Sequence, residues 1–448
     1  MGKLFGTDGV RGIANLELTA ELAYQLGRAG AYILTRSYKK AKIVIGRDTR
    51  ISGDMLEAAL TAGILSTGAD VLSVGIVPTP AVAYLTRHYG ANAGVVISAS
   101  HNPVEYNGIK FFSEEGFKLP DTMEEEIEDI ILNHKEVASN PTGKDIGKKI
   151  EIDDAIKQYA SFLKNTINVD LRGMKIAVDC ANGAAYVAAP SVLSALGAEL
   201  KIIHHKPDGL NINLNCGSTH PEAVQKQVID WGADIGLAFD GDADRLIAVD
   251  EKGQIVDGDK ILTICGSYLK ETGKLAQDTV VATVMSNIGL EIALKKANCK
   301  LERTNVGDRY VLEKMLQEGY NLGGEQSGHL IFLEHNTTGD GLLSALQLLM
   351  VMKEKKQALS KLAGAMTTYP QVLVNAKVSN GNKHSYMEDD VVAQEIKKLE
   401  SHMDGEGRVL IRPSGTEPLV RVMLEGKDEE ELKRLAQNLA KVIEERLL

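Results

Sequence analysis

The feature that most constrains the fold is a recurring succession of short apolar runs, each of which ends in a polar loop. Five such runs, rich in β-branched residues, begin at Lys42, Gly94, Lys175, Ile235 and Thr279. Apolar runs of four to six residues without strict alternation are typical of strands buried on both faces, as in α/β sheets. Ligands of such sheets bind beyond the carboxyl ends of the strands. The polar loops after the runs are therefore the candidate functional sites.

The last 80 or so residues follow a different pattern. Strand and helix signals occur there in the order β-α-β-β-α, which suits a small two-layer domain. The final helix has an apolar stripe that includes Leu432, Leu439 and Ile443, and acidic residues fill its first turn. We therefore predict an α/β protein with three similar α/β domains and a smaller α+β C-terminal domain. The predicted domains are residues 1–150, 151–255, 256–368 and 369–448.

Composition excludes several classes of protein. Apolar residues make up 44% and charged residues 25% of the 448 residues, which is typical of a globular chain. The net charge of −11 argues against a nucleic-acid-binding surface. The longest nearly apolar stretch, residues 341–352, is too short to cross a membrane, and no signal sequence is expected at MGKLFGTDGVRG. Four cysteines without a CxxC pair indicate reduced thiols and a cytoplasmic location.

The segment FDGDADR carries the most specific chemistry. Asp240, Asp242 and Asp244 alternate with small residues, so three carboxylates can converge on one cation, and hard oxygen ligands favour Mg²⁺ or Ca²⁺. An EF-hand would place Glu251 correctly at position twelve, but its sixth position requires glycine and here is Arg245. The preceding residues also resemble a strand instead of a helix. We predict a metal site, with a structural aspartate turn as the alternative.

Two further loops are candidates for covalent chemistry and anion binding. SASHNP follows a buried-strand pattern, and its serine could be a nucleophile, although on this fragment alone an ordinary Ser/Asn turn is the favoured interpretation. The G-x-S-x-G elbow of hydrolases is absent. RPSGTEP lies between two predicted strands, and its backbone N–H groups, hydroxyls and flanking arginines can bind phosphate. The alternative for that loop is a plain hairpin turn.

The segment GGEQSGHL offers a carboxylate, an amide, a hydroxyl and an imidazole among glycines. These groups suit a polyhydroxyl ligand such as a sugar, which needs several donors and acceptors. His329 taken alone would more often be a structural, hydrogen-bonded histidine. GTDGVRG is a weaker glycine-spaced loop with one arginine. Walker A and GxGxxG motifs are absent, which argues against a nucleotide kinase or a dehydrogenase.

Together these segments resemble the α-D-phosphohexomutase superfamily along essentially the whole chain. The amino-terminal, phosphoserine, metal, sugar and phosphate loops of that family are similar, in this order, to GTDGVRG, SASHNP, DGDADR, GEQSGH and RPSGTEP. The SASHNP and GEQSGH forms, with VGDRYV at residues 306–311, resemble the glucosamine branch of the family. Glucose and mannose mutases more often carry TASHNP and GEESGH.

The resemblance implies a role for each motif residue. Ser100 would carry the phosphoryl group and contribute one oxygen to a single Mg²⁺ ion. The implied catalytic and metal-binding residues are Ser100, His101, Lys110, Arg245, His329, Asp240, Asp242 and Asp244. Sugar contacts are expected from Glu325, Ser327, Asp308 and Arg309. Phosphate contacts are expected from Arg412, Ser414, Gly415, Thr416 and Arg421, and Thr7 and Arg11 belong to the amino-terminal active-site loop.

The resemblance further implies four domains around a central cleft and an isomerase that interconverts glucosamine 6-phosphate and glucosamine 1-phosphate. This reaction is a step towards UDP-N-acetylglucosamine and the cell wall. Glucose or glucosamine 1,6-bisphosphate is the expected activator, a sugar phosphate is the expected partner, and a homodimer is compatible with the resemblance. The alternatives are a phosphoglucomutase/phosphomannomutase of relaxed specificity and a Ca²⁺-dependent or sugar-binding protein without turnover.

Overall fold

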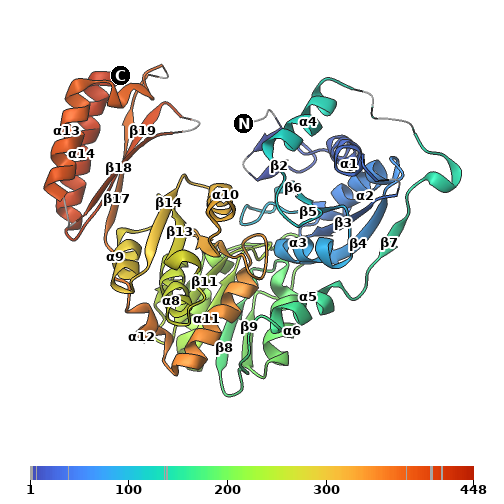
Figure 1. Ribbon diagram of the computed structural model, residues 1–448, viewed down its shortest axis with the longest axis horizontal. Coiled ribbons are helices and arrows are strands. Elements are labelled where there is room, and N and C mark those ends of the chain that lie inside the picture. The colour runs from blue at the N-terminus through green and yellow to red at the C-terminus, as the bar shows by residue number, and fades with distance from the viewer. Residues whose placement is uncertain are drawn as a thin grey trace. The chain divides into compact units, whose positions relative to one another are not determined.

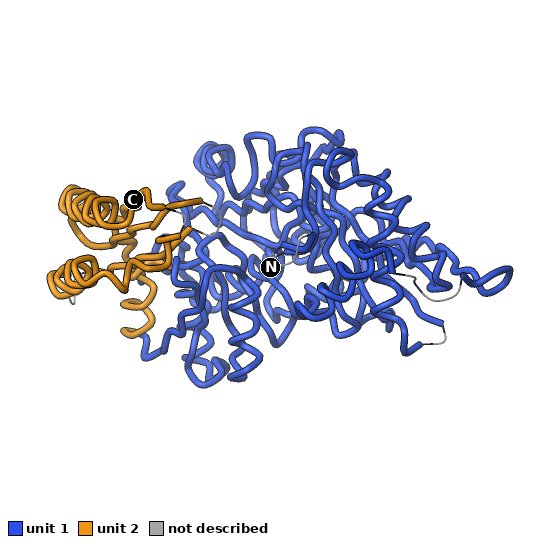
Figure 2. Tube along the Cα trace, turned by 90° about the horizontal axis from the view of Figure 1, so that it is seen from above, with its two compact units in different colours: residues 1–285, 297–365 blue, residues 286–296, 366–448 orange. Residues whose placement is uncertain are grey.

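The computed structural model describes residues 4–6, 8–38, 40–135, 137, 140–379, 381–403, 407–414 and 417–448. The chain forms two compact units, which Figure 2 shows in different colours. Unit 1 comprises residues 1–285 and 297–365, and unit 2 comprises residues 286–296 and 366–448.

The first part of unit 1 is a mixed sheet with packed helices. Its strands are β1 (Phe5–Gly6), β2 (Gly9–Ile13), β3 (Lys42–Arg47), β4 (Asp70–Ile76), β5 (Ala93–Ile97), β6 (Tyr106–Ser113) and β7 (Lys149–Glu151). Its helices are α1 (Ala20–Thr35), α2 (Ser52–Leu65), α3 (Thr79–His88) and α4 (Asp121–Leu132). The strand order is β1-β2-β6-β5-β3-β4-β7 (Figure 1). β3 is parallel to β4 and β5. The apolar runs that form β3 and β5 are buried, as predicted.

The second part of unit 1 repeats the α/β pattern. Its strands are β8 (Lys175–Asp179), β9 (Glu199–Ile203), β10 (Ile235–Phe239), β11 (Leu246–Asp250) and β12 (Ile255–Val256), and its helices are α5 (Ala155–Lys164), α6 (Ala185–Ala195) and α7 (Glu222–Trp231). The strand order is β12-β11-β10-β8-β9. β10 is parallel to β8 but antiparallel to β11. The segment 240–245 is therefore the turn of a buried hairpin.

The third part of unit 1 is a four-stranded sheet with helices, and it also contains a hairpin. Its strands are β13 (Thr279–Thr283), β14 (Lys300–Thr304), β15 (Leu322–Gly324) and β16 (Leu330–Phe332), in the order β14-β13-β15-β16. Its helices are α8 (Gly258–Glu271), α10 (Asp308–Glu318), α11 (Gly341–Lys355) and α12 (Leu359–Ala363). The apolar stretch of the sequence forms α11, which is buried along most of its length. No helix in the described ranges is long and apolar enough to span a membrane.

Unit 2 contains the predicted two-layer α+β domain. The elements of this unit are α9 (Ile288–Lys296), β17 (Gln371–Lys377), α13 (Asp390–Met403), β18 (Arg408–Pro413), β19 (Leu419–Glu425) and α14 (Glu429–Leu447). The strands are antiparallel in the order β17-β19-β18, and α13 and α14 cover one face (Figure 1). The apolar stripe of α14 packs on β19 through Leu432, Leu439 and Ile443. Each of the four cysteines, all of which lie in unit 1, is buried and unbridged.

Helices α1 and α2 approach each other closely because glycine lies at their crossing. A Cβ atom on Gly27 would lie 2.3 Å from the carbonyl oxygen of Leu60, and one on Gly63 would lie 2.2 Å from the carbonyl oxygen of Tyr24. These contacts are with backbone atoms, so no side-chain rotation can relieve them.

We predict that Gly63→Ala destabilises the protein, because the helices must separate to accept the methyl group. Overpacking of this kind costs about 1–3 kcal/mol, which urea unfolding followed by circular dichroism would measure. The exposed neighbour Ala62 is the matched control, and Ala62→Ser should change the stability by less than about 0.5 kcal/mol. Equal unfolding midpoints for the two variants would show that the crossing tolerates a larger residue.

Candidate functional site

Ser100 lies in the loop that follows β5, as the sequence predicts. It is a buried, non-glycine residue in the left-handed region, with φ of 51°. Its Oγ donates a 2.6 Å hydrogen bond to Oδ2 of Asp240 and lies 3.3 Å from Nδ1 of His101. The serine hydroxyl and the first aspartate of the hairpin turn, which are 140 residues apart, are thus direct neighbours.

The three aspartates of the β10–β11 turn converge as predicted. Asp240, Asp242 and Asp244 each offer an oxygen atom, and these atoms lie within 4.8 Å of one another. The turn can present all three because Ala243 adopts a left-handed conformation, with φ of 56°. Burial, followed by the charges of Asp244 and Asp242, raises the pKa of Asp240 well above its usual value. Like charges at this distance repel one another, and a cation among them would relieve the repulsion.

The geometry of these carboxylates fits a divalent cation. Oδ1 of Asp242 and Oδ1 of Asp244 are buried and accept no hydrogen bond from the protein. Such orphaned anionic oxygens are costly unless an ion binds them. All donors in the group are hard oxygens, which suits Mg²⁺ better than a soft transition metal. Asp240, Asp242 and Asp244 are therefore the residues that could hold the metal.

A second group of potential ligands differs from this one. Asp179, His204 and Cys216 also lie close enough together to bind an ion. However, both oxygens of Asp179 already accept hydrogen bonds, from the N–H groups of Ala181 and Gly217 and from His204. Burial raises the pKa of the Cys216 thiol to about 12, so it is not a ready thiolate ligand. This group is a hydrogen-bonded support for loops of the second sheet.

Lys110 brings a cation from β6 to the aspartates. Its ammonium group is 3.1 Å from Oδ2 of Asp242 and 2.8 Å from Oδ2 of Asp8, and its side chain is almost fully buried. Burial opposes the charged form, but the carboxylates of Asp242 and Asp8 outweigh it and raise the pKa of Lys110. The ammonium group therefore brings positive charge to the aspartates.

The ion pairs of Lys110 continue into a chain that joins the three parts of unit 1. Lys118 binds Oδ1 of Asp8 at 2.5 Å and also pairs with Asp308, the first residue of α10. Burial raises and the two lysines lower the pKa of Asp8, with a net shift well below its usual value. Alternating charges thus extend from Asp308 through Lys118, Asp8 and Lys110 to the metal loop.

His329 is buried beside the same loop. Nδ1 lies 3.5 Å from Oδ2 of Asp244, Nε2 lies 3.5 Å from Oδ2 of Asp308, and Nε2 also accepts the N–H of Gly339 at 3.2 Å. Burial would lower the pKa of His329, but the carboxylates of Asp244 and Asp308 raise it. His101 differs, because burial and the charges of Arg245 and Arg11 lower its pKa.

The sugar-loop residues lie in the β15–β16 turn. Oε1 of Glu325 accepts the N–H of Gly307 at 3.2 Å, and Oε2 accepts the Ser327 hydroxyl at 3.4 Å. The turn packs tightly on α8, since a Cβ on Gly258 would lie 2.1 Å from the Glu325 carbonyl oxygen. The Glu325 carboxylate is therefore fixed in place and only partly buried.

Of the remaining predicted residues of unit 1, Arg11 and Arg245 lie near the serine and metal loops, whereas Arg309 makes other contacts. Arg11 lies near the phosphoserine loop, where it bonds Oδ1 of Asn102 at 3.3 Å and Asp8 at 3.2 Å. The Arg245 guanidinium lies 3.9 Å from Asp244. Arg309, in contrast, pairs with Asp121 and Glu313. Its side chain thus binds carboxylates of α4 and α10 in this structure.

The predicted phosphate loop belongs to unit 2. Arg412 on β18 and Arg421 on β19 are directly paired in the register of the sheet. Burial and the charge of Arg421 lower the pKa of Arg412. The Arg421 guanidinium donates to the Ser414 hydroxyl at 3.5 Å. The predicted residues Thr7, Gly415 and Thr416 lie outside the described residues.

Several residues of the site carried no sequence prediction. Thr79 donates its hydroxyl to Oδ2 of Asp242 at 2.7 Å and its N–H to the Asp242 carbonyl oxygen at 2.9 Å. Asp8 lies inside GTDGVRG, and Arg50 follows β3 in GRDTR, so the strand-end rule could have indicated them. Lys118 and Thr79 lie in segments without a recognisable motif.

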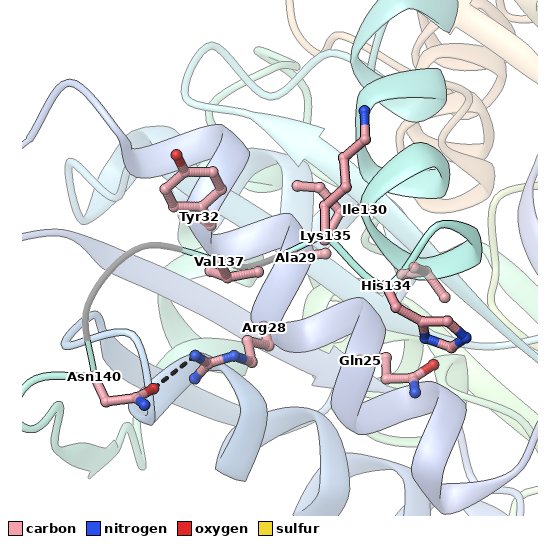
Figure 3. A pocket seen from close by; sticks show the side chains of 10 residues that line it. Gln25, Arg28, Ala29, Tyr32, Ile130, His134, Lys135, Val137 and Asn140 are labelled. Carbon is pink, nitrogen blue, oxygen red and sulfur yellow. Dashed lines mark hydrogen bonds between the residues drawn. The ribbon is translucent and has the colours of Figure 1, made fainter.

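A pocket on the first part of unit 1 is separate from these residues (Figure 3). It lies beside α1 and α4 and is lined by Gln25, Arg28 and Tyr32, among others. The Arg28 guanidinium is bonded to Oδ1 of Asn140 at 2.7 Å and to the Ser66 hydroxyl at 2.8 Å. Because its principal cation is engaged in these contacts, we assign the pocket no catalytic role.

Comparison with known proteins decides the family. The four domain models of phosphoglucomutase/phosphomannomutase match the chain in order: alpha/beta/alpha domains I, II and III match residues 2–138, 157–253 and 257–369, and the C-terminal domain matches residues 373–442. The chain belongs to the phosphoglucomutase/phosphomannomutase family. The residues matched cover the three parts of unit 1 and the α+β domain.

Individual members of the phosphoglucomutase/phosphomannomutase family are similar over the whole chain. Phosphoglucosamine mutase of Alkaliphilus oremlandii is 63% identical over 448 residues, 100% of both chains. A phosphoglucomutase/phosphomannomutase family protein of Burkholderia thailandensis has a similar structure, with a TM-score of 0.80, 25% identity, and coverage of 99% of this chain and 98% of that one. N-acetylphosphoglucosamine mutase of Aspergillus fumigatus, solved with GlcNAc-6P and magnesium, shares the fold at a TM-score of 0.66 and 18% identity, covering 100% and 96%.

We predict that Asp244→Asn weakens Mg²⁺ binding roughly tenfold or more, because the number of charged ligands sets the affinity of oxygen-ligand sites. Isothermal titration of Mg²⁺ into the protein without substrate would measure the dissociation constant. Asp230→Asn is the matched control, since Asp230 is exposed and pairs with Lys226 on α7. Unchanged affinity in Asp244→Asn would contradict the metal site.

Proposed function

We propose that this chain is a phosphoglucosamine mutase that interconverts glucosamine 6-phosphate and glucosamine 1-phosphate. The observation that carries the proposal is the hydrogen bond from the Ser100 hydroxyl to Asp240, within a buried aspartate group that fits a divalent cation. The 63% identical relative from Alkaliphilus oremlandii is a phosphoglucosamine mutase. A sugar-binding protein without turnover would not require a buried nucleophile beside three carboxylates.

The proposed reaction proceeds through phosphorylated Ser100. The C1 hydroxyl of glucosamine 6-phosphate attacks this phosphoryl group, so that the C1 oxygen–phosphorus bond forms and the Oγ–phosphorus bond breaks, while the hydroxyl proton passes to Ser100 Oγ, the leaving group. The 1,6-bisphosphate then turns over in the site. Ser100 Oγ takes the phosphoryl group from C6, and the C6 oxygen is protonated. The product is glucosamine 1-phosphate, and the enzyme is phosphorylated again.

Residues of unit 1 supply the charge stabilisation that phosphoryl transfer requires. Lys110 and Arg245 lie beside the aspartates, where their positive charges would stabilise the transferred phosphoryl group. Mg²⁺ bound by Asp240, Asp242 and Asp244 would act as a Lewis acid on the phosphoryl oxygens. His329 is our candidate for proton transfer, because its imidazole is held between two carboxylates.

The other parts of the proposal concern ligands and assembly. Arg412, Ser414 and Arg421, with Gly415 and Thr416 of the same loop, would bind the phosphate that is not being transferred. Glucose or glucosamine 1,6-bisphosphate would activate the enzyme by phosphorylating Ser100. We place the reaction in the cytoplasm, and we expect a homodimer, which light scattering would test.

We predict that Ser100→Ala abolishes mutase activity, because the variant lacks the only oxygen that can carry the phosphoryl group. Incubation with glucose 1,6-bisphosphate should add a phosphate-sized mass to the unmodified protein and none to the variant. The matched control is Ser113→Ala, whose hydroxyl bonds Glu115 at the exposed end of β6. Mutase turnover by folded Ser100→Ala at the unmodified rate would rule out the covalent mechanism.

We also predict a preference for glucosamine 6-phosphate over glucose 6-phosphate. The substrates differ at C2, where a protonated amine replaces a hydroxyl, and the fixed carboxylate of Glu325 favours the amine. A charge-assisted hydrogen bond contributes about 1.5–3 kcal/mol, or roughly ten- to a hundredfold in kcat/KM. Initial-rate measurements on both substrates would give this ratio.

The role of Glu325 is tested separately. Glu325→Gln should reduce the ratio of kcat/KM values, whereas Glu318→Gln at the exposed end of α10, where Glu318 pairs with Lys314, should leave it unchanged. Equal kcat/KM values for both sugars in the unmodified enzyme would favour the alternative, a phosphoglucomutase/phosphomannomutase of relaxed specificity. That outcome would leave the mutase mechanism intact.

A further inference from the structure

Arg50 is a fully buried arginine that the proposed mechanism does not use. It follows β3 and pairs with Asp48, the two groups meeting at 2.9 Å between Nε and Oδ2. Neither side chain is appreciably exposed to solvent. Because removing two charges from water is costly, such a pair persists only where further hydrogen bonds satisfy it. The partners of this pair are therefore informative.

The partners of Arg50 are backbone carbonyl groups of the phosphoserine loop. Nη2 donates to the carbonyl oxygen of Ser100 at 2.9 Å and to that of Asn102 at 2.8 Å, and Nη1 donates to that of Pro103. Only the planar fork of arginine can reach three carbonyl groups and a carboxylate at once. The guanidinium group thus fixes the backbone on the carboxyl side of Ser100.

Asp48 fixes the backbone on the amino side of Ser100, through the Ser98 hydroxyl. The Ser98 hydroxyl donates to Oδ2 of Asp48 at 2.6 Å, and the same hydroxyl accepts the N–H of Ser100 at 3.0 Å. The buried pair therefore holds both the amide and the carbonyl group of Ser100. The serine side chain, which lies between these two anchors, is left to face Asp240.

A residue of the second part of unit 1 binds the same backbone groups. Nδ2 of Asn213 donates to the carbonyl oxygen of Ser100 at 2.9 Å and to that of Asn102 at 3.2 Å, the same two groups that Arg50 binds. Gly241 of the metal loop lies against the Ser100 carbonyl group, where a Cβ would come within 2.5 Å of the oxygen. Residues of both the first and the second part of unit 1 thus contact the loop that carries Ser100.

These contacts explain the backbone of Ser100. A non-glycine residue with φ of 51° is strained and persists only when its surroundings determine it. In this conformation, Oγ lies 2.6 Å from Oδ2 of Asp240. An extended backbone at this residue would redirect the hydroxyl away from the metal loop. The anchors at the backbone thus determine where the phosphoryl group can be.

We propose that Arg50, together with Asp48, is a positioning residue for phosphoryl transfer, which holds Ser100 in its strained conformation so that Oγ faces the metal loop. This inference rests on the proposed mutase function. The Arg50 guanidinium binds the Asp48 carboxylate and backbone carbonyl groups, not the Ser100 hydroxyl. It acts through the backbone of residues 100–103, and Asn213 assists it from the second domain.

The test is Arg50→Lys, which keeps the charge but lacks the planar fork. Mutase turnover would be measured with glucosamine 6-phosphate and glucose 1,6-bisphosphate. A displacement of about 1 Å can reduce a rate roughly a hundredfold, so we expect kcat to fall on the order of 10- to 100-fold. KM for the sugar phosphate should stay within about threefold, because the groups that bind sugar are untouched.

The matched control is Arg47→Lys, three residues earlier. Arg47 is also an ion-paired arginine at the end of β3, but its partners are Glu57 and Asp54 on α2. It should lose some thermal stability and keep its kcat. Mass spectrometry after incubation with the bisphosphate should show slower phosphorylation of Ser100 in Arg50→Lys alone.

Each outcome separates the positioning role from a structural one. If Arg50→Lys lowers the melting temperature but keeps the unmodified kcat and phosphorylation rate, Arg50 is merely structural and the inference is overturned. If Arg50→Lys does not fold, Asn213→Ala replaces it, since that variant leaves the buried pair intact, and an unchanged kcat there overturns the inference. If the unmodified protein itself shows no mutase turnover, the proposed function fails instead.

Discussion

The structure depends on the crowding of negative charge at the β10–β11 turn. Asp240, Asp242 and Asp244 are buried together, and two of their oxygens have no hydrogen-bond donor in the protein. Burying even one unpaired carboxylate is unfavourable. Positive charge must therefore reach the turn, and the protein provides the Lys110 ammonium group from the first domain, while the His329 imidazole of the third lies beside Asp244. The remaining negative charge makes the site suitable for a divalent cation.

The same charges hold the three parts of unit 1 together. The chain of ion pairs from Asp308 through Lys118, Asp8 and Lys110 begins on α10, crosses the first sheet, and ends at the hairpin of the second. Removing one member of a buried pair leaves an uncompensated charge, at a cost of about 3–5 kcal/mol. The ion pairs that place Lys110 beside the aspartates thus also connect the three parts of unit 1.

Much of this arrangement can be predicted from the sequence because it depends on local patterns. The buried strands β3, β5, β8, β10 and β13 follow from β-branched apolar runs, and the convergence of Asp240, Asp242 and Asp244 follows from their alternation with small residues. The family matches confirm the four-domain organisation. The individual roles of the site residues stay predictions.

What could not be predicted depends on contacts between distant segments. Thr79 meets Asp242 across 163 residues, and Asn213 meets Ser100 across 113. No local pattern distinguishes these side chains from ordinary surface threonine and asparagine. The position of Arg50 at a strand end could be noticed in the sequence, but its contacts could not, since apart from Asp48 its partners are backbone carbonyl groups, which every sequence contains.

The α+β domain of unit 2 contains a pair of neighbouring positive charges, in contrast to the buried aspartates of unit 1. Its arginines, Arg412 and Arg421, are directly opposite each other on β18 and β19. Like charges in such a cross-strand pair destabilise a sheet, and burial with this repulsion lowers the pKa of Arg412. A bound phosphate dianion would relieve the repulsion through charge-assisted hydrogen bonds. Two guanidinium forks would recognise phosphate and not the sugar attached to it. They could therefore hold either end of a bisphosphate, which a mutase requires because its intermediate must turn over.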